Sequence, residues 1–573
     1  MRRANLPLSV VWDVYTNQKL TVKKFIQKNA EYRDLQFLDK QWISNIKQPI
    51  TSEGLVDTLA GYIVRMGSRA THYQSLGMIG SKNVDKETYL FKPNVKWIRE
   101  LTKLILILQP VNSQILISIN QAVYKKEGEF FLNYDSSCQA HISEKSPLGT
   151  CLEWLIVNQR VTFSSFQKFT KRLFSDYIND WQAIIKEMIK KDLIVCQLEP
   201  KSLNSNLIEN DFSILKSKFI PKQLRVKVNN ILFLFKALDD SSPQLDVIRE
   251  IRKSMNSIVN VGIDPIYIQH LIPIDKVNYF PLNIGKKLKM FYSMLSVLTP
   301  AYREGRKLKA YMLTQTGMYQ ELDFFKGISA HNESANYKFK IDKTYEECMR
   351  NYKEKLNRVL TSNNGNHIMF DDDDIDTLMK TLAKAVDHTA PKANFDFLFN
   401  MYKVHEQNFF YIPTSGFQAE GSFFNKIKND ETITRRKPYF PEIEYLSHYL
   451  PEIGRQSLVT NRMIQVNGYN TLIKNKLDLK QVCFVVDKSG LHLEEKGKAL
   501  KLFPMKTSLI ELHYQKESGT AAFLEDIGNY LIQKPTNLFI PNYYEYTHLP
   551  RIQYKNVILL KEMWNFKINE SYK

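Results

Sequence analysis

The stretch YIVRMGSRATHYQSLGMIG, residues 62–80, decides the fold prediction. It continues an amphipathic run that begins at a capping Thr51 or Ser52. The apolar residues of that run recur at helical spacing: Leu55, Leu59, Ile63 and Met66. Such a stripe predicts a helix with one face in a core. Arg65 and Arg69 are four residues apart and therefore share a neighbouring face, and we expect the helix to end near Thr71.

Downstream of this helix the periodicity changes. The segment WIRELTKLILIL, residues 97–108, predicts a buried helix that ends before Pro110. Residues 113–134 are rich in β-branched and aromatic side chains around Glu127-Gly128, which predicts a hairpin. Three short helical segments and the strand LIVCQL complete a predicted winged-helix module. Such modules read DNA or take up a peptide as an added strand, and the fold alone does not choose between them.

The sequence predicts an α+β protein in four parts. These are residues 1–112 with the two arginines, the winged-helix module 113–200, a mainly helical and basic region 201–440, and a β-rich region 441–573. In the third part the basic clusters 285–289, 305–309 and 435–437 could line a phosphate track, although any single cluster is more often a solvated helix face. The acidic run Asp371 to Asp374 lacks the spacing of a calcium loop. It predicts a charged loop that caps a helix beginning at Ile375.

The composition predicts a globular protein with an excess of positive charge. The chain has 573 residues, 43% of them hydrophobic, and 79 Lys and Arg against 60 Asp and Glu give a formal charge of +19. Nucleic acid or phosphate is thus one candidate partner, and a surface charged for solubility is the alternative. The five scattered cysteines predict neither a disulfide frame nor a metal site. Without a signal peptide or membrane span in the sequence, we expect a cytoplasmic protein.

Three segments, in this order, resemble markers of the lantibiotic dehydratase family in its N-terminal, glutamylating portion. Residues 62–80 are similar to that family's R-M-S-x-R-x-T-P-F-G signature. The predicted winged helix resembles its embedded leader-peptide recognition element. LPRIQYKNVILLKEMW, residues 549–564, is similar to the PR-x-x-YG-x-x-V-L-x-x-x-x-W segment that ends the glutamylating portion. Together the markers span nearly the whole chain.

The resemblance implies a large multi-subdomain fold and a transferase of peptide antibiotic biosynthesis. Glutamate would move from glutamyl-tRNA, the co-substrate, onto Ser or Thr hydroxyls of a ribosomally synthesised precursor peptide that is held by its leader. No cofactor, metal or membrane is implied, and a homodimer is left open. Because the sequence ends nine residues after Trp564, we expect a separate protein to perform the elimination, as in split thiopeptide-type dehydratases.

The resemblance also names candidate site residues. By similarity these are Arg65, Arg69 and Thr71 of the signature, Arg2 (with Arg3 close behind) as an N-terminal arginine, and Asn94 at an expected acidic position. The two guanidiniums would grip the glutamyl carboxylate or tRNA phosphates. Thr71 would donate a hydrogen bond to the ester.

Several positions depart from the family's pattern. Residues 72–74 replace the Pro-Phe-Gly of the signature, and Gln269 or His270 stands near a second expected aspartate. An amide has no useful basicity near neutral pH, so Asn94 cannot replace a carboxylate that must accept a proton. Three alternatives therefore stay open: a catalytically depleted leader-binding scaffold, an aminoacyl-tRNA-dependent peptide ligase, and internal ion pairs for the two signature arginines.

Overall fold

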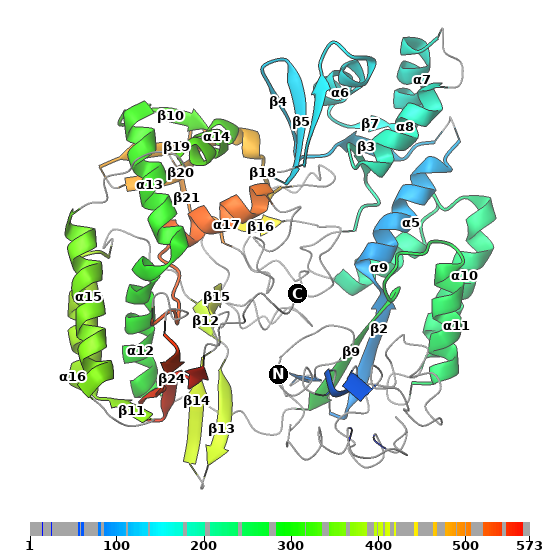
Figure 1. Cartoon of the computed structure of the whole chain (residues 1–573). Helices are drawn as coiled ribbons and strands as arrows, with labels where there is room; N and C mark the ends of the chain where they lie inside the picture. Colours follow the sequence, from blue (N-terminus) through cyan, green and yellow to red (C-terminus); the bar gives the residue numbers. More distant parts are fainter. Residues whose placement is uncertain are drawn as a thin grey trace, which may run out of the picture.

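Helices and small sheets follow one another along the chain in the computed structural model (Figure 1). The structure describes residues 14, 25, 56–57, 59–61, 63, 78–81, 85–110, 113–135, 138–175, 180–200, 207–238, 243–273, 282–315, 317–334, 343–362, 367–386, 395–397, 399–404, 407–412, 417–419, 441–444, 462–466, 476–488, 490–498, 500–505, 519–540 and 546–564. Most of the buried apolar side chains among them gather in three large cores.

The first core lies on the right of Figure 1 and joins residues from Tyr89 to Ile268. Its elements are β2 (Thr88–Pro93), α5 (Val95–Ile107), β3 (Leu116–Ile119), β4 (Val123–Lys126), β5 (Glu129–Asp135), β6 (Cys138–Ser143), α6 (Pro147–Asn158), β7 (Val161–Thr162), α7 (Phe163–Leu173), α8 (Asp180–Lys190), β8 (Ile194–Cys196), α9 (Leu207–Leu215), α10 (Lys222–Ala237), α11 (Leu245–Asn256) and β9 (Ile266–Pro273). Trp97 of α5 is fully buried in it, and its indole Nε1 donates to the Met255 carbonyl at 3.1 Å. The core therefore extends across residue 200, the predicted boundary between the second and third parts.

The local predictions for this region are confirmed. The helix expected at 97–108 is α5, and the hairpin expected around Glu127-Gly128 joins β4 to β5. Both turn residues have positive φ, 51° and 79°, as the tight turn of a two-residue hairpin requires. The helices α6, α7 and α8 and the strand β8 follow in the expected order. The assignment of 113–200 as a winged helix stays a prediction.

A buried ionic cluster joins α5 to the residues on either side of β8. Lys103 and Arg99 contact the carboxylate of Asp192 at 3.0 and 3.2 Å, and Arg99 lies 3.9 Å from Glu199. Burial raises the pKa of Glu199 to about 7, although Arg99 opposes the rise. Because an unpaired charge would be costly at this depth, the cluster fixes how α5 and β8 meet.

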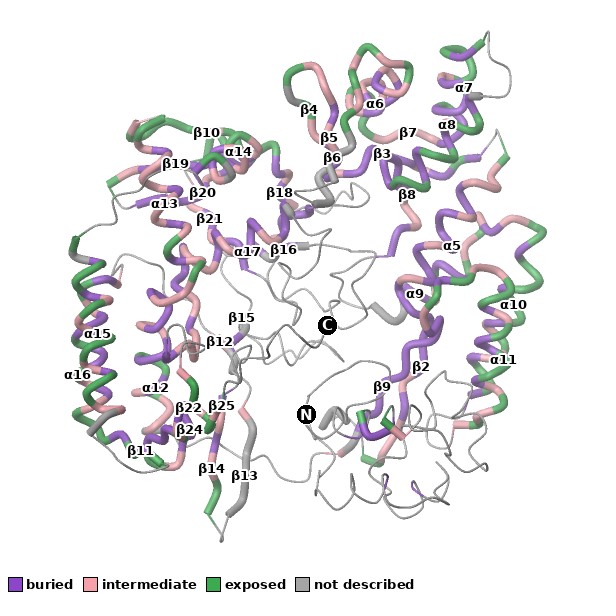
Figure 2. Tube along the Cα trace, viewed as in Figure 1, coloured by how far each residue is buried: buried purple, intermediate pink, exposed green. Residues whose placement is uncertain are grey.

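The second and third cores lie on the other side of the molecule in Figure 1. The second contains α12 (Leu282–Met294), η2 (Leu295–Leu298), α15 (Lys343–Ser362), β11 (His367–Phe370), α16 (Asp372–Leu382), β13 (Asn400–Val404), β14 (Gln407–Tyr411), β23 (Arg551–Tyr554) and β24 (Val557–Leu560). The third contains α13 (Pro300–Gln315), β10 (Glu321–Asp323), α14 (Phe324–Ser334), β16 (Glu442–Glu444), β17 (Met463–Gln465), β18 (Lys476–Leu477), η4 (Leu479–Gln481), β19 (Val482–Asp487), β20 (Gly490–Glu495), β21 (Leu500–Leu502) and α17 (Gly519–Leu531). Figure 2 shows buried and exposed residues alternating along α15, as in a helix with one packed face.

Sheet order in these two cores brings distant segments together. The five-stranded sheet of the second core runs β11-β23-β24-β14-β13, so the strands of the third sequence marker lie between residues 367–370 and 407–411. A four-stranded sheet, β10-β19-β20-β21, belongs to the third core. Smaller pairings join β12 (Phe395–Phe397) to β15 (Phe417–Ala419) and β22 (His548–Leu549) to β25 (Met563–Trp564).

The acidic run has a different boundary from the expected one. The prediction that the helix begins at Ile375 is wrong, because α16 begins at Asp372. Asp371 is its N-cap and accepts a hydrogen bond from the Asp374 N–H at 2.8 Å, while Asp374 accepts from the Asp371 N–H. Acidic side chains in the first turn satisfy open N–H groups and complement the helix dipole, so the run extends the helix rather than preceding it.

In the parts of the chain that the structure describes, no helix is both long and apolar enough to cross a membrane.

Candidate functional site

The structure describes one of the predicted site residues, Asn94. Arg2, Arg65, Arg69 and Thr71 lie outside the described residues. The helix predicted before the signature is described in part, and Leu59 and Ile63 of its apolar stripe have no exposed surface. The stripe of that helix therefore faces a core at these two positions, as predicted.

The strand at the end of the signature stretch enters a small mixed sheet. β1 (Met78–Ser81) pairs in parallel with β9, and β2 pairs antiparallel with the other edge of β9. In this register His270 of β9 lies directly between Met78 and Tyr89. The sheet thus places Met78, near the end of the first sequence marker, beside His270. This is where the family's pattern predicts an acid.

His270 is buried and held on two sides. Its side chain is 1% exposed, and its ring stacks on Tyr89 with 4.4 Å between ring centroids. Its Nε2 contacts the Oε1 of Glu87, the residue immediately before β2, whose side chain is 36% exposed. A partly exposed carboxylate that contacts a buried imidazole is a positioned acceptor for a proton or a hydrogen bond.

The structure separates Gln269 from His270. Successive residues of a strand point to opposite faces of the sheet, so the two side chains cannot serve the same site. Gln269 shares its face with Lys92, which forms a buried ion pair with Asp211 of α9 at 3.5 Å. Of the two sequence candidates, the histidine is the one that faces a carboxylate.

Asn94 has a structural task. It is the N-cap of α5, is 4% exposed, and its amide oxygen accepts the Lys96 N–H at 3.0 Å. Its own N–H donates to the Pro265 carbonyl at 2.7 Å and so joins the end of β2 to the start of β9. It is five residues from Tyr89, roughly 16 Å along the strand. Asn94 and His270 therefore lie at opposite ends of one strand pair.

Glu87 was missed by the sequence analysis. A single acid before a strand pattern matches no motif, and its partner His270 is 183 residues away in the chain. The one signal in the sequence is the histidine at position 270, where the family's pattern predicts an aspartate. A chain without that aspartate could take a carboxylate from another segment.

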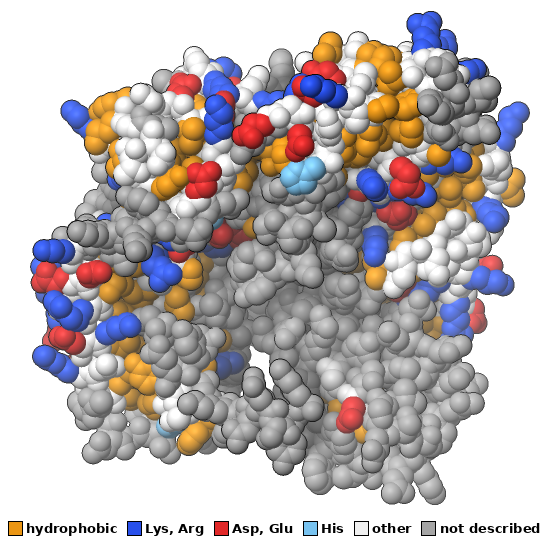
Figure 3. Space-filling view, turned by 45° about the horizontal axis from the view of Figure 1, so that its top comes forward, with side chains coloured by type: hydrophobic (Ala, Val, Ile, Leu, Met, Phe, Trp, Pro, Cys, Tyr) orange, Lys and Arg blue, Asp and Glu red, His pale blue; other side chains and the backbone are white. Residues whose placement is uncertain are grey.

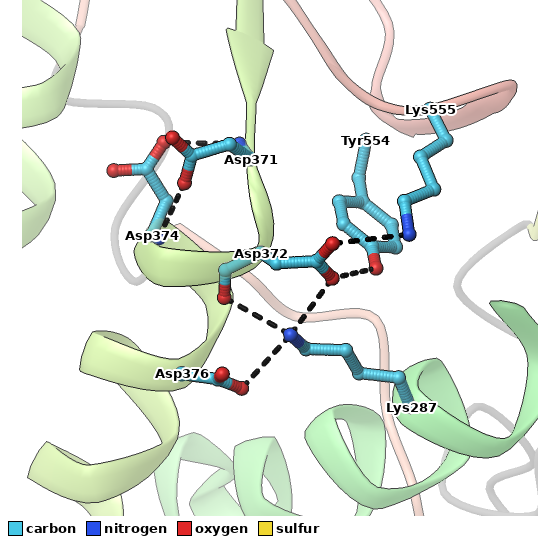
Figure 4. A network of polar contacts seen from close by, with 7 residues as sticks. All are labelled: Lys287, Asp371, Asp372, Asp374, Asp376, Tyr554 and Lys555. Carbon is cyan, nitrogen blue, oxygen red and sulfur yellow. Dashed lines mark hydrogen bonds and ion pairs between the residues drawn. The ribbon is translucent and has the colours of Figure 1, made fainter.

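The basic clusters are partly engaged in other contacts. Lys287, of the cluster 285–289, contacts Asp372 at 2.8 Å and Asp376 at 3.0 Å (Figure 4). The guanidinium of Arg306, of the cluster 305–309, lies over the Tyr345 ring at 5.3 Å. The cluster 435–437 lies outside the described residues. Figure 3 shows Lys and Arg spread among Asp and Glu over the face drawn, which favours the reading as solvated helix faces.

The described residues hold no group of three or more His, Cys, Asp or Glu side chains placed to bind a metal ion. Glu87 and His270 form a pair, and His492 contacts two acids, Asp487 at 3.7 Å and Glu494 at 2.8 Å.

Comparison with known proteins shows the fold. No family model and no curated protein sequence matches this chain. The tRNA-dependent lantibiotic dehydratase MibB from Microbispora sp. 107891 is similar in structure, with a TM-score of 0.66 and 10% identity over 98% of this chain. The chain spans 59% of the length of MibB.

The second relative is the glutamylation domain TbtB from thiomuracin biosynthesis. Its structure bound to 5'-phosphodesmethylglutamycin has a TM-score of 0.63 and 10% identity, over 94% of this chain and 73% of that domain. A further structure of TbtB gives the same TM-score at 11% identity and the same coverage. At such identities the likeness shows the fold, which is that of the glutamylating portion of lantibiotic dehydratases.

Proposed function

With a glutamylation-domain fold as the premise, we propose that this chain transfers glutamate from glutamyl-tRNA to Ser or Thr hydroxyls of a ribosomally synthesised precursor peptide. The observation that carries the proposal is the fold likeness over 98% of the chain to a tRNA-dependent dehydratase. The signature-like stretch at residues 62–80 supports it, because β1 leads from that stretch into the sheet that holds Glu87 and His270.

The chemistry asks little covalent work of the protein. An aminoacyl ester is already activated, so the protein has to hold ester and hydroxyl in line and stabilise the oxyanion. The formal charge of +19 would favour a tRNA partner and make its binding weaken with salt. The leader of the precursor peptide would bind at residues 113–200, and elimination of glutamate would follow at a second active site. No further cofactor is part of the proposal.

Mass spectrometry of a reconstituted reaction tests the transfer. We expect the chain, glutamyl-tRNA and a Ser/Thr-rich precursor peptide encoded beside its gene to give a peptide heavier by one glutamyl group. The product should be labile to mild base, since an ester hydrolyses and an amide does not. A base-stable product would instead indicate the peptide ligase. Failure to form any product with glutamyl-tRNA would contradict the proposal.

The signature arginine provides the first prediction. We expect Arg69→Ala to lower the transfer rate by about 100-fold or more, because a group that holds the charged substrate is lost. Arg249→Ala is the control, since Arg249 is an exposed residue of α11 paired with Asp246 at 3.0 Å. Equal transfer rates for the two variants would show that Arg69 of the signature has no part in the transfer.

A second candidate function is a scaffold that binds the leader peptide without catalysis. It is favoured by Asn94, whose amide is buried and committed to capping α5. A scaffold would bind the precursor peptide in a titration and give no tRNA-dependent product. Arg69→Ala would then leave peptide affinity unchanged, and the absence of a tRNA-dependent product from wild type separates the two functions.

A further inference from the structure

We propose that Glu87 is the group that accepts the proton of the peptide hydroxyl, and that His270 is the positioning residue that aims its carboxylate. The inference rests on the proposed glutamyl transfer and gives one of its steps to a residue outside the signature. It follows from the contact between the two side chains at the sheet β1-β9-β2.

The position of the pair in the sheet supports this role. His270 is in the central strand, with β1 on one side and β2 on the other. β1 begins at the end of the signature stretch, and Glu87 immediately precedes β2. The family's pattern predicts an acid near residue 270, where this chain has a histidine. Glu87 therefore brings a carboxylate from another strand to this place.

The burial of the two partners differs in the way that a positioned base requires. The His270 side chain is 1% exposed and its ring is stacked on Tyr89, so it has little freedom to turn. The Glu87 side chain is 36% exposed and can meet a substrate. The pairs His141–Glu129 and His548–Glu562 have exposed or half-exposed histidines. The pair His492–Glu494 has a buried histidine, but its glutamate side chain is only 17% exposed.

The proposed step balances without a further reactant. The peptide hydroxyl oxygen forms a bond to the glutamyl carbonyl carbon, and the bond from that carbon to the ribose oxygen of the tRNA breaks. Glu87 takes the hydroxyl proton as the new bond forms and returns it to the departing ribose oxygen. Proton transfer to a positioned carboxylate contributes about 10²–10⁴-fold to such reactions.

Steady-state kinetics of Glu87→Gln test the inference. Glutamine keeps the size of the side chain and can still contact His270, but it cannot accept a proton. We expect kcat to fall by about 100-fold or more, with the KM for peptide and for glutamyl-tRNA within about twofold of wild type. Glu87→Asp should recover part of kcat, because a carboxylate is restored on a shorter side chain.

The positioning role of His270 has its own readout. If the two residues act as a unit, His270→Asn should lower kcat and leave KM unchanged, and the double variant should be no slower than Glu87→Gln alone. A merely structural histidine would give independent, additive losses.

Glu494→Gln is the matched control. Glu494 contacts the buried His492 at 2.8 Å in the third core, so its loss imposes a similar structural change at a distant place. We expect wild-type kcat for this variant. If folded Glu87→Gln had the kcat of wild type, the inference would be overturned. The proposed function would still stand, because the wild-type protein would still form the ester product. An absence of product from wild type would instead end the proposed function itself.

Discussion

Asp372 lies in the first turn of α16 and contacts residues of two other segments of the chain (Figure 4). The Tyr554 hydroxyl donates to its carboxylate at 2.6 Å, and Lys287 and Lys555 contact it at 2.8 and 3.2 Å. Hydrogen bonds from Lys287, Tyr554 and Lys555 hold the pKa of Asp372 well below its usual range. Lys555 has a φ of 50° at the turn between β23 and β24, where the family's segment has glycine. Its side chain therefore adds a contact at a position where a non-glycine residue is uncommon.

The depressed pKa of Asp372 predicts a pH-dependent stability. A carboxylate with a lower pKa in the folded state stabilises the fold above its usual pKa, and this contribution is lost as the pH falls through the folded value. Asp372→Asn should lower Tm at pH 7, and the difference from wild type should shrink as the pH falls below about 4. Asp373→Asn, in the same turn, is the control for the helix dipole. Differential scanning calorimetry would contradict the network if the difference in Tm did not change with pH.

At the scale of elements, α13 and α17 show how one small residue sets a helix contact. Gly305 of α13 faces the ring of Tyr530 of α17, and a Cβ built at residue 305 would lie 2.2 Å from that ring. No real Cβ approaches a ring so closely, so with any larger residue at 305 either the Tyr530 ring or the two helices must shift. Gly61 is also helical, but it is exposed and has open space at its Cβ position.

The two glycines predict opposite effects of the same substitution. Gly305→Ala should destabilise the protein by about 1–3 kcal/mol, because it overpacks the contact with Tyr530. Gly61→Ala should stabilise it by about 0.5–1 kcal/mol, because alanine loses less backbone freedom on folding. Urea unfolding of both variants measures the difference. If both substitutions changed the free energy of unfolding in the same direction, α13 and α17 could not be in close contact at Gly305.

At the scale of the whole molecule, the hairpin of the first core is attached to the third core. Tyr124 of β4 stacks on Phe325 of α14 with 4.7 Å between ring centroids, and it also stacks on Phe131 of β5 at 5.4 Å. β5 lies next to α17 as well. The segment predicted to bind a leader peptide is thus held in place relative to the rest of the protein by an aromatic contact.

This attachment predicts a coupling that a double-mutant cycle can measure. Tyr124→Leu and Phe325→Leu should each destabilise the protein, with a coupling energy of about 0.5–1.5 kcal/mol between them. Hydrogen exchange of residues 123–135 should also become faster in Phe325→Leu. The pair Trp154–Phe169, which joins α6 to α7 within the first core, is the control, and Phe325→Leu should leave exchange in those helices unchanged. Additive effects of the two leucine variants would exclude the coupling.

By itself, the sequence determined the local elements: α5 and its end before Pro110, the hairpin at Glu127-Gly128, and the order of helices up to β8. Periodicity, turn residues and a helix breaker act over a few residues, so they can be read along the chain. The predicted start of α16 was wrong by three residues, because aspartates are common both in loops and in the first turn of a helix. The three markers also indicated the fold that the structural relatives show.

Only the tertiary structure decided which of Gln269 and His270 faces a carboxylate, that this carboxylate is Glu87, and that Asn94 is a helix cap. It also placed the third marker inside the second core, between strands from residues 367–370 and 407–411. The physical reason is the same in each case. Contacts between residues far apart in the chain depend on strand order and register, and many sheet orders are compatible with the same local pattern of apolar and polar residues.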